Sequence, residues 1–379
     1  MKHQVTCQIT TVAAAAFLGT VSLAVGAAAA SPSPAREPAT VVVSGLTNPR
    51  GFTWAADGTM VIALAGNGGE VEGIWAGGPS GIFGGPTASI VRIEDGCPVT
   101  VAPGLPSGDY RAADWVWGAM DVAFLDGQLY ALLGGGGEDY GNPGSPNGVY
   151  RVNGDGSVTM LANLSSWLGD VPSKEFAADY NSDGSLFDME AGAGALWVSE
   201  AVGGRLLKVT PDGAITLIAD LSVGHTVPTG VALAPDGGAY VGFETAAPWT
   251  DGSSRVVHVA EDGMVSEVWT GLTAVTDIAL GPDGALYAAE MATGNTTDGS
   301  NIHPGTGRVV RQDGPDGLVV IADGLDFPSY LGFAPDGSLL VGSPAIGAND
   351  GEGTITRIAV GDPEGADSGP APTCAIAAQ

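Results

Sequence analysis

The chain has 379 residues with a formal net charge of −29, from 42 acidic and 13 basic residues, and only two lysines, Lys174 and Lys208, lie beyond residue 30. Nucleic acids and anionic lipid surfaces are polyanions whose binding needs clusters of Lys and Arg, so these partners are excluded. The 61 glycines and 25 prolines exclude a protein of long helices, and the 44% hydrophobic content excludes a disordered acidic chain.

The N-terminus has the pattern of a secretory signal peptide over residues 1–30. Lys2 and His3 precede an apolar stretch that is too short and too interrupted by Gly and Ser to span a bilayer, and Ala28-Ala29-Ala30 supplies a small-residue cleavage site. A Ser/Pro linker follows over residues 31–38. An uncleaved anchor is the alternative. The pattern predicts a secreted or periplasmic protein with no later membrane span.

One pattern then repeats six times along the chain. Each copy has a short apolar run, a turn that is Asp-Gly in five of the six copies, and a second apolar run, which together are a strong hairpin signal. A third strand follows in every copy, and a fourth follows in all but the last. The first runs of the copies, in chain order, are Gly51–Trp54, Asp121–Leu125, Asp188–Ala191, Gly230–Ala234, Asp277–Leu280 and Leu331–Ala334.

Four strands per copy, at a spacing of about 45 to 70 residues, is typical of the blades of a β-propeller. The sixth copy has no fourth strand after Thr354–Ile358, whereas Thr40–Leu46 has that strand's pattern but precedes the first copy. We therefore predict an all-β, six-bladed propeller of four-stranded antiparallel blades over residues 39–362, closed by the N-terminal strand pairing into the last blade. Residues 363–379 are expected to be a flexible tail. A pair of β-sandwiches, the alternative, would not need repeated copies of one motif.

The opening of the repeat region resembles a known family. The segment Ser44-Gly-Leu-Thr-Asn-Pro-Arg-Gly-Phe-Thr-Trp-Ala-Ala-Asp-Gly58, followed by Ile62-Ala-Leu-Ala-Gly66, is similar to the first blade of the ScyD/ScyE family. The likeness continues through Ser89-Ile-Val-Arg-Ile93 and the blade pattern around Asp277 to Glu290. The resemblance implies an exported, NHL-like propeller of six blades, and it brings no catalytic motif.

Acidic residues recur at equivalent positions of the repeat. Asp121, Asp188 and Asp277 begin the innermost strands of three copies, and Glu200 and Glu290 end second strands on the same face. Carboxylates gathered around one mouth repel each other unless a cation or a proton lies between them, and Ca²⁺ prefers oxygen ligands of this kind. Alternatively, each Asp binds backbone N–H groups and ties neighbouring blades together.

A second candidate metal site is a segment with the spacing of an EF-hand loop. Asp179, Asn181, Asp183 and Glu190 stand at its positions 1, 3, 5 and 12, with Gly184 at position 6 for the sharp turn. Against this interpretation, Phe187 occupies position 9, a strand rather than a helix follows, and the repeat alignment places Asp188 and Glu190 on an inner strand.

Two cysteines remain after the signal peptide, Cys97 and Cys374. An exported protein favours a disulfide between them, and two free, buried thiols are the alternative. Aromatic residues also gather in or beside segments that we assign to loops, where a flat or sugar-like ligand or inter-blade packing would explain them. These residues are Trp75, Tyr110, Trp115, Trp117, Tyr140, Trp249 and Tyr330.

These features favour an exported, non-catalytic binding or scaffolding propeller with a small-molecule or extracellular ligand, stabilised by a divalent cation such as Ca²⁺. The alternative is a hydrolase of the lactonase/SMP-30 kind, with a divalent metal held in the channel by Asp121, Asp188 and Asp277. A third interpretation, a quinone-cofactor sugar dehydrogenase, would use Arg50 and His225. The candidate ligand-binding residues are Arg50, Glu200, His225, Glu290 and Tyr330.

Overall fold

The computed structural model describes residues 39–75, 78–177 and 179–360. The described residues all belong to one compact unit. The predicted signal peptide, the Ser/Pro linker and the tail at 363–379 lie outside them. In the part of the chain that is described, no helix is long and apolar enough to cross a membrane.

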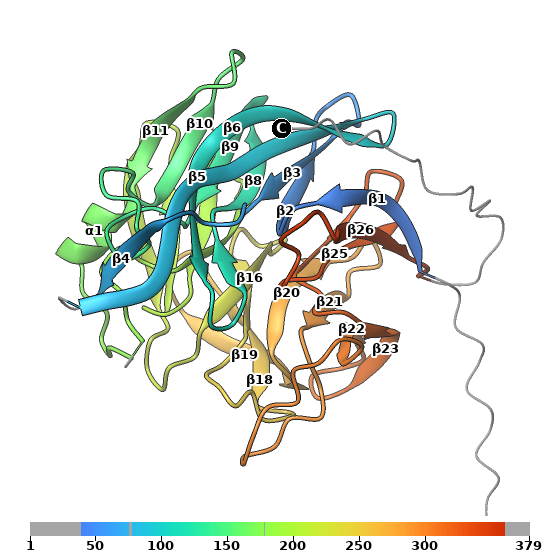
Figure 1. The fold of residues 1–379 in the computed structure, drawn as a ribbon. Coiled ribbons are helices and arrows are strands. Elements are labelled where there is room, and N and C mark those ends of the chain that lie inside the picture. The colour runs from blue at the N-terminus through green and yellow to red at the C-terminus, as the bar shows by residue number, and fades with distance from the viewer. Residues whose placement is uncertain (1–38, 76–77, 178, 361–379) are drawn as a thin grey trace, which may run out of the picture. The chain divides into compact units, whose positions relative to one another are not determined.

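The described unit consists of six antiparallel sheets, which we number as blades 1 to 6 in chain order of their inner strands. In blades 2 to 5 consecutive strands pair, from the inner strand outwards (Figure 1). Blade 2 contains β8 (Ala119–Leu125), β9 (Gln128–Leu133), β10 (Gly148–Val152) and β11 (Val158–Asn163). Blade 3 contains β12 (Leu186–Gly192), β13 (Ala195–Glu200), β14 (Arg205–Val209) and β15 (Ile215–Asp220). Blade 4 contains β16 (Pro228–Leu233), β17 (Ala239–Phe243), β18 (Ser254–Val259) and β19 (Val265–Leu272). Blade 5 contains β20 (Val275–Leu280), β21 (Leu286–Glu290), β22 (Gly307–Gln312) and β23 (Leu318–Leu325).

Blade 6 combines the two ends of the described chain. Its strands β24 (Tyr330–Phe333), β25 (Leu339–Ser343) and β26 (Gly353–Ile358) are completed by β1 (Thr40–Leu46), which pairs antiparallel with β26. In Figure 1 the blue β1 lies beside the dark red β26. The predicted pairing of the leading strand with the last blade is therefore confirmed.

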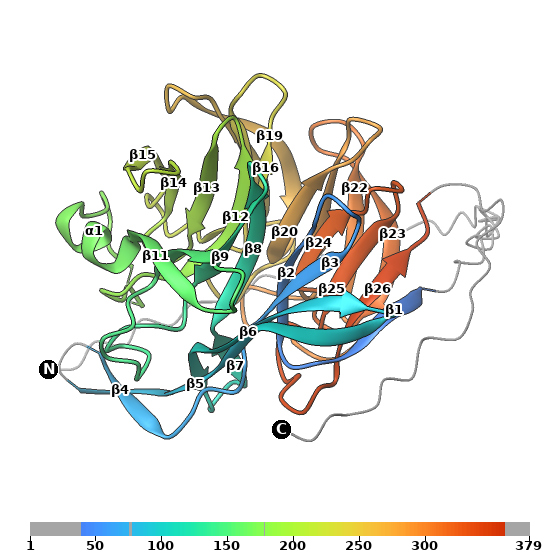
Figure 2. The same cartoon turned by 90° about the horizontal axis from the view of Figure 1, so that it is seen from above.

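Blade 1 is larger than the repeat predicts. Besides β2 (Pro49–Trp54) and β3 (Met60–Leu64), it has long strands β5 (Gly78–Glu94) and β6 (Cys97–Tyr110). Two short strands, β4 (Val71–Trp75) and β7 (Trp115–Trp117), pair with these extensions, which Figure 2 shows reaching past the other blade strands. Trp75, Tyr110, Trp115 and Trp117 therefore lie in strands, and their assignment to loops was wrong. Glycine-rich sequence hid the pairing, which depends on backbone hydrogen bonds rather than on alternating side chains.

Apolar side chains fill the spaces between neighbouring blades. Ile62 and Val91 of blade 1 share one cluster with Leu340 and Ile355 of blade 6, so the first and last blades pack together. Each inner strand packs against the next, and β24 packs against β2. The inner strands thus surround one channel. Because the strands are antiparallel, the starts of the inner strands and the loops between blades lie at one end, which we call the loop face, and the hairpin turns lie at the other.

The structure has one short helix that the repeat does not predict, α1 (Leu164–Asp170), between blades 2 and 3. Asn163 caps its first turn, because the Asn163 side-chain oxygen accepts a hydrogen bond from the backbone N–H of Ser166 at 2.9 Å. The helix buries Leu164 and Leu168 against the core of blades 2 and 3. It leads into the loop-face connection that precedes β12.

Candidate functional site

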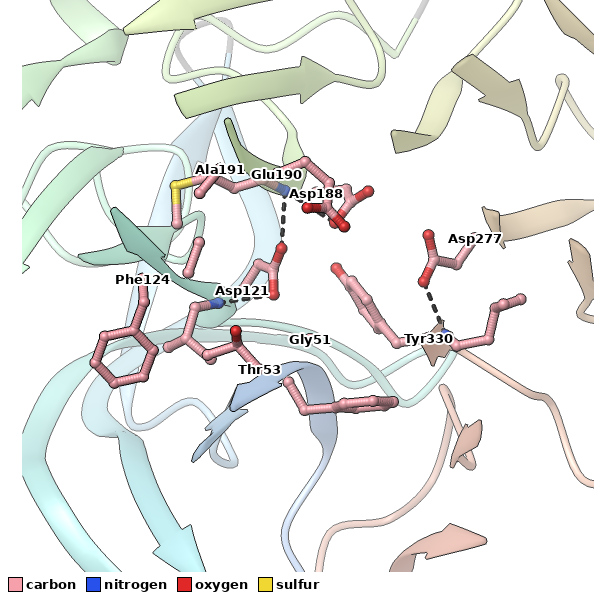
Figure 3. A pocket seen from close by; sticks show the side chains of 14 residues that line it. Gly51, Thr53, Asp121, Phe124, Asp188, Glu190, Ala191, Asp277 and Tyr330 are labelled. Atoms are coloured by element: carbon pink, nitrogen blue, oxygen red, sulfur yellow. Dashed lines mark hydrogen bonds between the residues drawn. The ribbon is translucent and has the colours of Figure 1, made fainter. Parts of the chain in front are cut away.

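The channel is lined by one equivalent position from each inner strand. Around the ring this position holds Gly51, Asp121, Asp188, Gly230, Asp277 and Tyr330, in blades 1 to 6. The sequence alignment of Asp121, Asp188 and Asp277 is therefore confirmed, and each of these three side chains is 4–5% exposed. Figure 3 shows the carboxyl groups turned toward a common space, with Tyr330 reaching in from the opposite side.

Each of the three Asp carboxylates connects its own strand to the next blade. Asp121 accepts hydrogen bonds from the N–H of Val122 at 2.7 Å and from that of Met189 in blade 3 at 2.8 Å. Asp188 accepts from Met189 at 2.8 Å and from Val231 in blade 4 at 2.6 Å.

Asp277 repeats this arrangement between blades 5 and 6. It accepts hydrogen bonds from Ile278 at 2.7 Å and from Leu331 in the next blade at 2.8 Å (Figure 3). The arrangement matches the inter-blade role that the sequence left open as the alternative to metal binding.

Glycine in blades 1 and 4 leaves room for these carboxylates. A Cβ atom at Gly51 would lie 1.6 Å from Asp121 Oδ1, and one at Gly230 would lie 2.6 Å from Asp277 Oδ1. No real Cβ approaches an atom so closely, so a side chain at either glycine would displace the neighbouring carboxylate. The glycines and the Asp residues of the ring therefore depend on each other.

Tyr330 closes the channel at the level of this ring. Its hydroxyl donates a hydrogen bond to the carbonyl of Phe187, and the two rings stack with centroids 5.7 Å apart. Because Phe187 belongs to blade 3 and Tyr330 to blade 6, the contact crosses the full width of the channel. Burial, followed by the nearby Asp121 carboxylate, raises the pKa of Tyr330 well above its ordinary value, so the hydroxyl keeps its proton.

Arg50 lies beside Tyr330, on the side of the channel that faces the inter-blade loops. It is 3% exposed, and its guanidinium donates to the carbonyl of Val116 in β7 at 2.7 Å and to that of Pro49 at 3.1 Å. Burial lowers the pKa of Arg50 to about 10, which leaves the group charged at neutral pH. Arg50 thus attaches the extra strand of blade 1 to the channel wall.

A cavity of about 140 Å³ lies next to Tyr330 and extends toward the hairpin turns. Four carboxyl groups line it, those of Asp121, Asp188, Glu190 and Asp277 (Figure 3). Glu190 lines this cavity with an exposed side chain. Desolvation inside the channel, followed by the charge of Asp188, raises the pKa of Glu190 to about 8.

The pKa values of the three aspartates also rise. Burial is the largest cause for each, and the charge of Asp188 adds to it for Asp121 and Asp277. Burial and crowding therefore make the ionised form of all four carboxyl groups less favourable, and a positive charge in the cavity would offset that cost.

Glu200 and Glu290 do not reach the cavity. They are 1% and 0% exposed, and each faces an arginine on the next strand of its own blade. Glu200 Oε2 lies 3.9 Å from Arg205 Nε, and Glu290 accepts a hydrogen bond from Arg308. Glu200 also accepts from the N–H of Gly203 at 2.9 Å. These contacts make both glutamates supports of the loop face, and their ligand-binding role stays a prediction.

The side chains of the EF-hand-like segment do not converge on one position but have separate partners. Asp179 Oδ1 pairs with His225 Nε2 at 3.2 Å, and the Asn181 amide donates to the Tyr140 hydroxyl at 3.1 Å. Asp183 accepts from the N–H of Asp139 at 3.0 Å, while Glu190 lies on β12 in the channel. Over the described residues, no three His, Cys, Asp or Glu side chains are arranged to hold a metal ion. The metal roles of this segment and of the three channel aspartates stay predictions.

Three other features bear on the site. Cys97 begins β6 and takes part in a disulfide, but Cys374 lies outside the described residues, so their pairing stays a prediction. The backbone carbonyls of Phe187 and Val116 accept hydrogen bonds from Tyr330 and Arg50, and no sequence pattern identifies such acceptors. Glu244 directly follows β17 and is 6% exposed. The sequence did not single it out, although Glu200 and Glu290 occupy similar positions in blades 3 and 5.

Comparisons with known proteins show which solved structures share this fold. No protein-family model and no curated protein matches this sequence. Solved structures do match. A Thermus thermophilus protein described as an oxidoreductase (glucose dehydrogenase) has a TM-score of 0.57 at 15% identity, covering 85% of this chain and 99% of its own. The calcium-binding protein regucalcin of Agrobacterium tumefaciens has a TM-score of 0.52 at 15% identity, covering 85% and 94%. A protein described as a gluconolactonase has a TM-score of 0.50 at 12% identity, covering 86% and 93%.

This chain is a six-bladed β-propeller. At such low identities the likeness shows the fold alone, and the same fold serves unrelated chemistries. The resemblance to the ScyD/ScyE family stays a prediction.

Proposed function

We propose that this propeller binds a small cation in the acidic channel cavity. The observation that carries the proposal is the position of Glu190. Its carboxyl group reaches into a cavity that three further carboxyl groups line, while those three are already occupied as links between blades. Crowded carboxyl groups whose pKa values are raised form a site in which a cation is favoured.

The cavity size sets the kind of cation. About 140 Å³ accommodates an ion that keeps several of its own waters, or a primary ammonium group. Direct coordination by three carboxylates does not fit the arrangement of the described side chains, so we derive no reaction step through a metal. Hydrated Ca²⁺ and a small organic ammonium share the required chemistry, and the experiment separates them.

Calorimetric titration tests this proposal. We expect the protein to bind Ca²⁺ or methylammonium more tightly at pH 9 than at pH 6, because Glu190 must lose its proton first. Glu190→Gln should weaken binding, and Glu72→Gln, which removes an exposed charge on β4, should not. Binding that is absent at both pH values, or unaffected by Glu190→Gln, would contradict the proposal.

A second candidate is a metal-dependent hydrolase of lactones or small esters. The likeness to propellers described as a gluconolactonase and as calcium-binding regucalcin supports it. In this candidate Asp121, Asp188 and Asp277 would hold the ion once the links to the next blades loosen. Hydrolysis of gluconolactone with added Ca²⁺ or Mn²⁺, lost on adding EDTA and in Asp188→Asn, would favour it over simple binding.

We also propose that the protein is exported after cleavage near Ala30. The N-terminal pattern of a short apolar stretch and small residues supports this. The N-terminal sequence of the protein recovered from a secreting host should begin close to Ser31. Recovery of the chain with residues 1–30 intact would contradict export by this route.

A further inference from the structure

Buried polar atoms without a hydrogen-bond partner gather in the loops of blades 3 and 4. Among the described residues, Asn181 Oδ1, Arg205 Nη1 and Glu244 Oε1 are fully buried and have no such partner. Native proteins satisfy nearly all buried polar atoms, so each exception calls for an explanation, such as a bound molecule. Arg205 is explained in part by its ion pair with Glu200.

Three loop-face segments bring Asp179, His225 and Glu244 together, and Asn181 lies two residues after Asp179. His225, in the connection from blade 3 to blade 4, pairs with Asp179 at 3.2 Å. The N–H of Glu244 donates to the carbonyl of Val227 at 2.9 Å, which attaches the loop after β17 to the same connection. The charge of Asp179 acts on Glu244, and the Trp249 indole lies against the Glu244 carboxyl group. Imidazole, carboxyl groups and indole thus form one cluster.

The backbone around this cluster is strained. His225, Val227, Thr245 and Trp249 all have positive φ, at 51°, 52°, 66° and 54°. A β-branched residue such as Val227 or Thr245 is rarely found there, because its side chain is strained at positive φ. Strain of this kind persists where the surroundings hold it, and it concentrates at ligand-binding sites.

An aromatic wall adjoins the polar cluster. The Trp249 ring stacks on Trp115 of blade 1 with centroids 6.2 Å apart and planes inclined by 30°. Both indoles are half-buried, so part of each ring is available at the loop face. A flat apolar surface beside unpaired hydrogen-bonding groups suits a ligand with C–H faces and hydroxyl edges.

The charges of the cluster select the class of ligand. An anion would meet the carboxylates of Asp179 and Glu200, and a cation would meet the guanidinium of Arg205, so a neutral ligand is favoured. Asn181 Oδ1 and Glu244 Oε1 call for donors, whereas Arg205 Nη1 calls for an acceptor. Sugar hydroxyls both donate and accept. Burial raises the pKa of Glu244 to about 8, which keeps this carboxyl group uncharged at neutral pH and agrees with a neutral ligand.

We propose that the loop face of blades 3 and 4 is a carbohydrate-binding site, in which His225, Glu244 and Asn181 bind the hydroxyls of a neutral sugar that packs against Trp249. The site shares no residue with the channel cavity. Sugar binding can therefore be tested independently of cation binding.

Titration of the protein with neutral sugars tests the proposal. The probes are glucose, galactose, maltose and cellobiose, followed by calorimetry and by the emission of the tryptophans, with glucosamine and glucuronate as charged comparisons. We expect saturable binding of at least one neutral sugar and weaker binding of its charged analogue. His225→Asn tolerates positive φ and Glu244→Gln keeps the shape of the side chain, and each should weaken binding by up to about tenfold.

Glu190→Gln is the matched control, because it removes a carboxyl group of the channel and leaves the loop face intact. It should bind the sugar as the unchanged protein does. The proposal is overturned if no neutral sugar binds, if His225→Asn and Glu244→Gln both bind as tightly as the unchanged protein, or if Glu190→Gln is the variant that loses binding.

Discussion

At the scale of single residues, the channel shows why a position is easier to predict than a role. The repeat places Asp121, Asp188 and Asp277 at one level of the channel, and the structure confirms it. Their hydrogen bonds to Met189, Val231 and Leu331 of the next blades could not be read from the sequence, because they depend on how far one blade is rotated against another. The partners of Tyr330 and Arg50 are backbone carbonyls, which every residue has.

The first prediction concerns Glu190 and pH. Its pKa in the folded protein, about 8, exceeds that of an unfolded glutamate, about 4.3, so the folded state binds the proton more tightly. The resulting stability is complete below about pH 4.3 and is lost as pH rises through 8. Glu190→Gln should therefore match the unchanged protein in Tm at pH 4 and exceed it by a few degrees at pH 9. Equal Tm values at pH 9, measured without added cations, would show that Glu190 is not crowded in the cavity.

The second prediction concerns Asp277 as a link between blades. Asp277→Ala leaves the buried N–H groups of Ile278 and Leu331 without acceptors, at a cost of about 1–3 kcal/mol each. Relief of repulsion from Asp188 offsets part of this loss. We expect a clear fall in the free energy of unfolding by urea denaturation, and no such fall for Asp298→Ala, which removes an exposed carboxylate. Equal stabilities would mean that the carboxylate is not a link.

At the scale of elements, the hairpin signals identified the six blades but not the elements outside the repeat, which are the extra strands of blade 1 and helix α1. The Asp-Gly turns between inner and second strands marked the hairpins correctly, although only Asp126-Gly127 is a two-residue turn; in blade 1, for example, Trp54 pairs with Met60 across five residues. The extensions β4 to β7 of blade 1 have no apolar alternation, although backbone pairing orders Val71–Trp75 and the start of β5. Helix α1 is short and contains Gly169, so no helical periodicity marks it.

The third prediction concerns β1 as the outer strand of blade 6. Val43 is 3% exposed and packs in the cluster shared by blades 1 and 6. Val43→Asp buries an unpaired charge there, so Tm should fall by several degrees or more. Ser44→Asp adds the same charge on the same strand at a half-buried position and should have a smaller effect. Equal Tm values for the two variants would show that β1 adds little to the blade.

At the scale of the whole molecule, the propeller brings four carboxyl groups from three blades into one cavity and closes it on the loop side with Tyr330 and Arg50. The sequence predicted the six-bladed architecture and the approach of the acids, because both follow from one repeat. It could not predict the cavity, whose floor depends on a contact between blades 3 and 6.

The most direct test of the central claim is an anomalous difference map from crystals grown at pH 9 with Mn²⁺, a strongly scattering divalent cation. The account predicts a peak inside the cavity between Glu190 and Asp188, and its absence from crystals of Glu190→Gln. A map with no peak in the channel, or with its peak among Asp179, Asn181 and Asp183 instead, would contradict it.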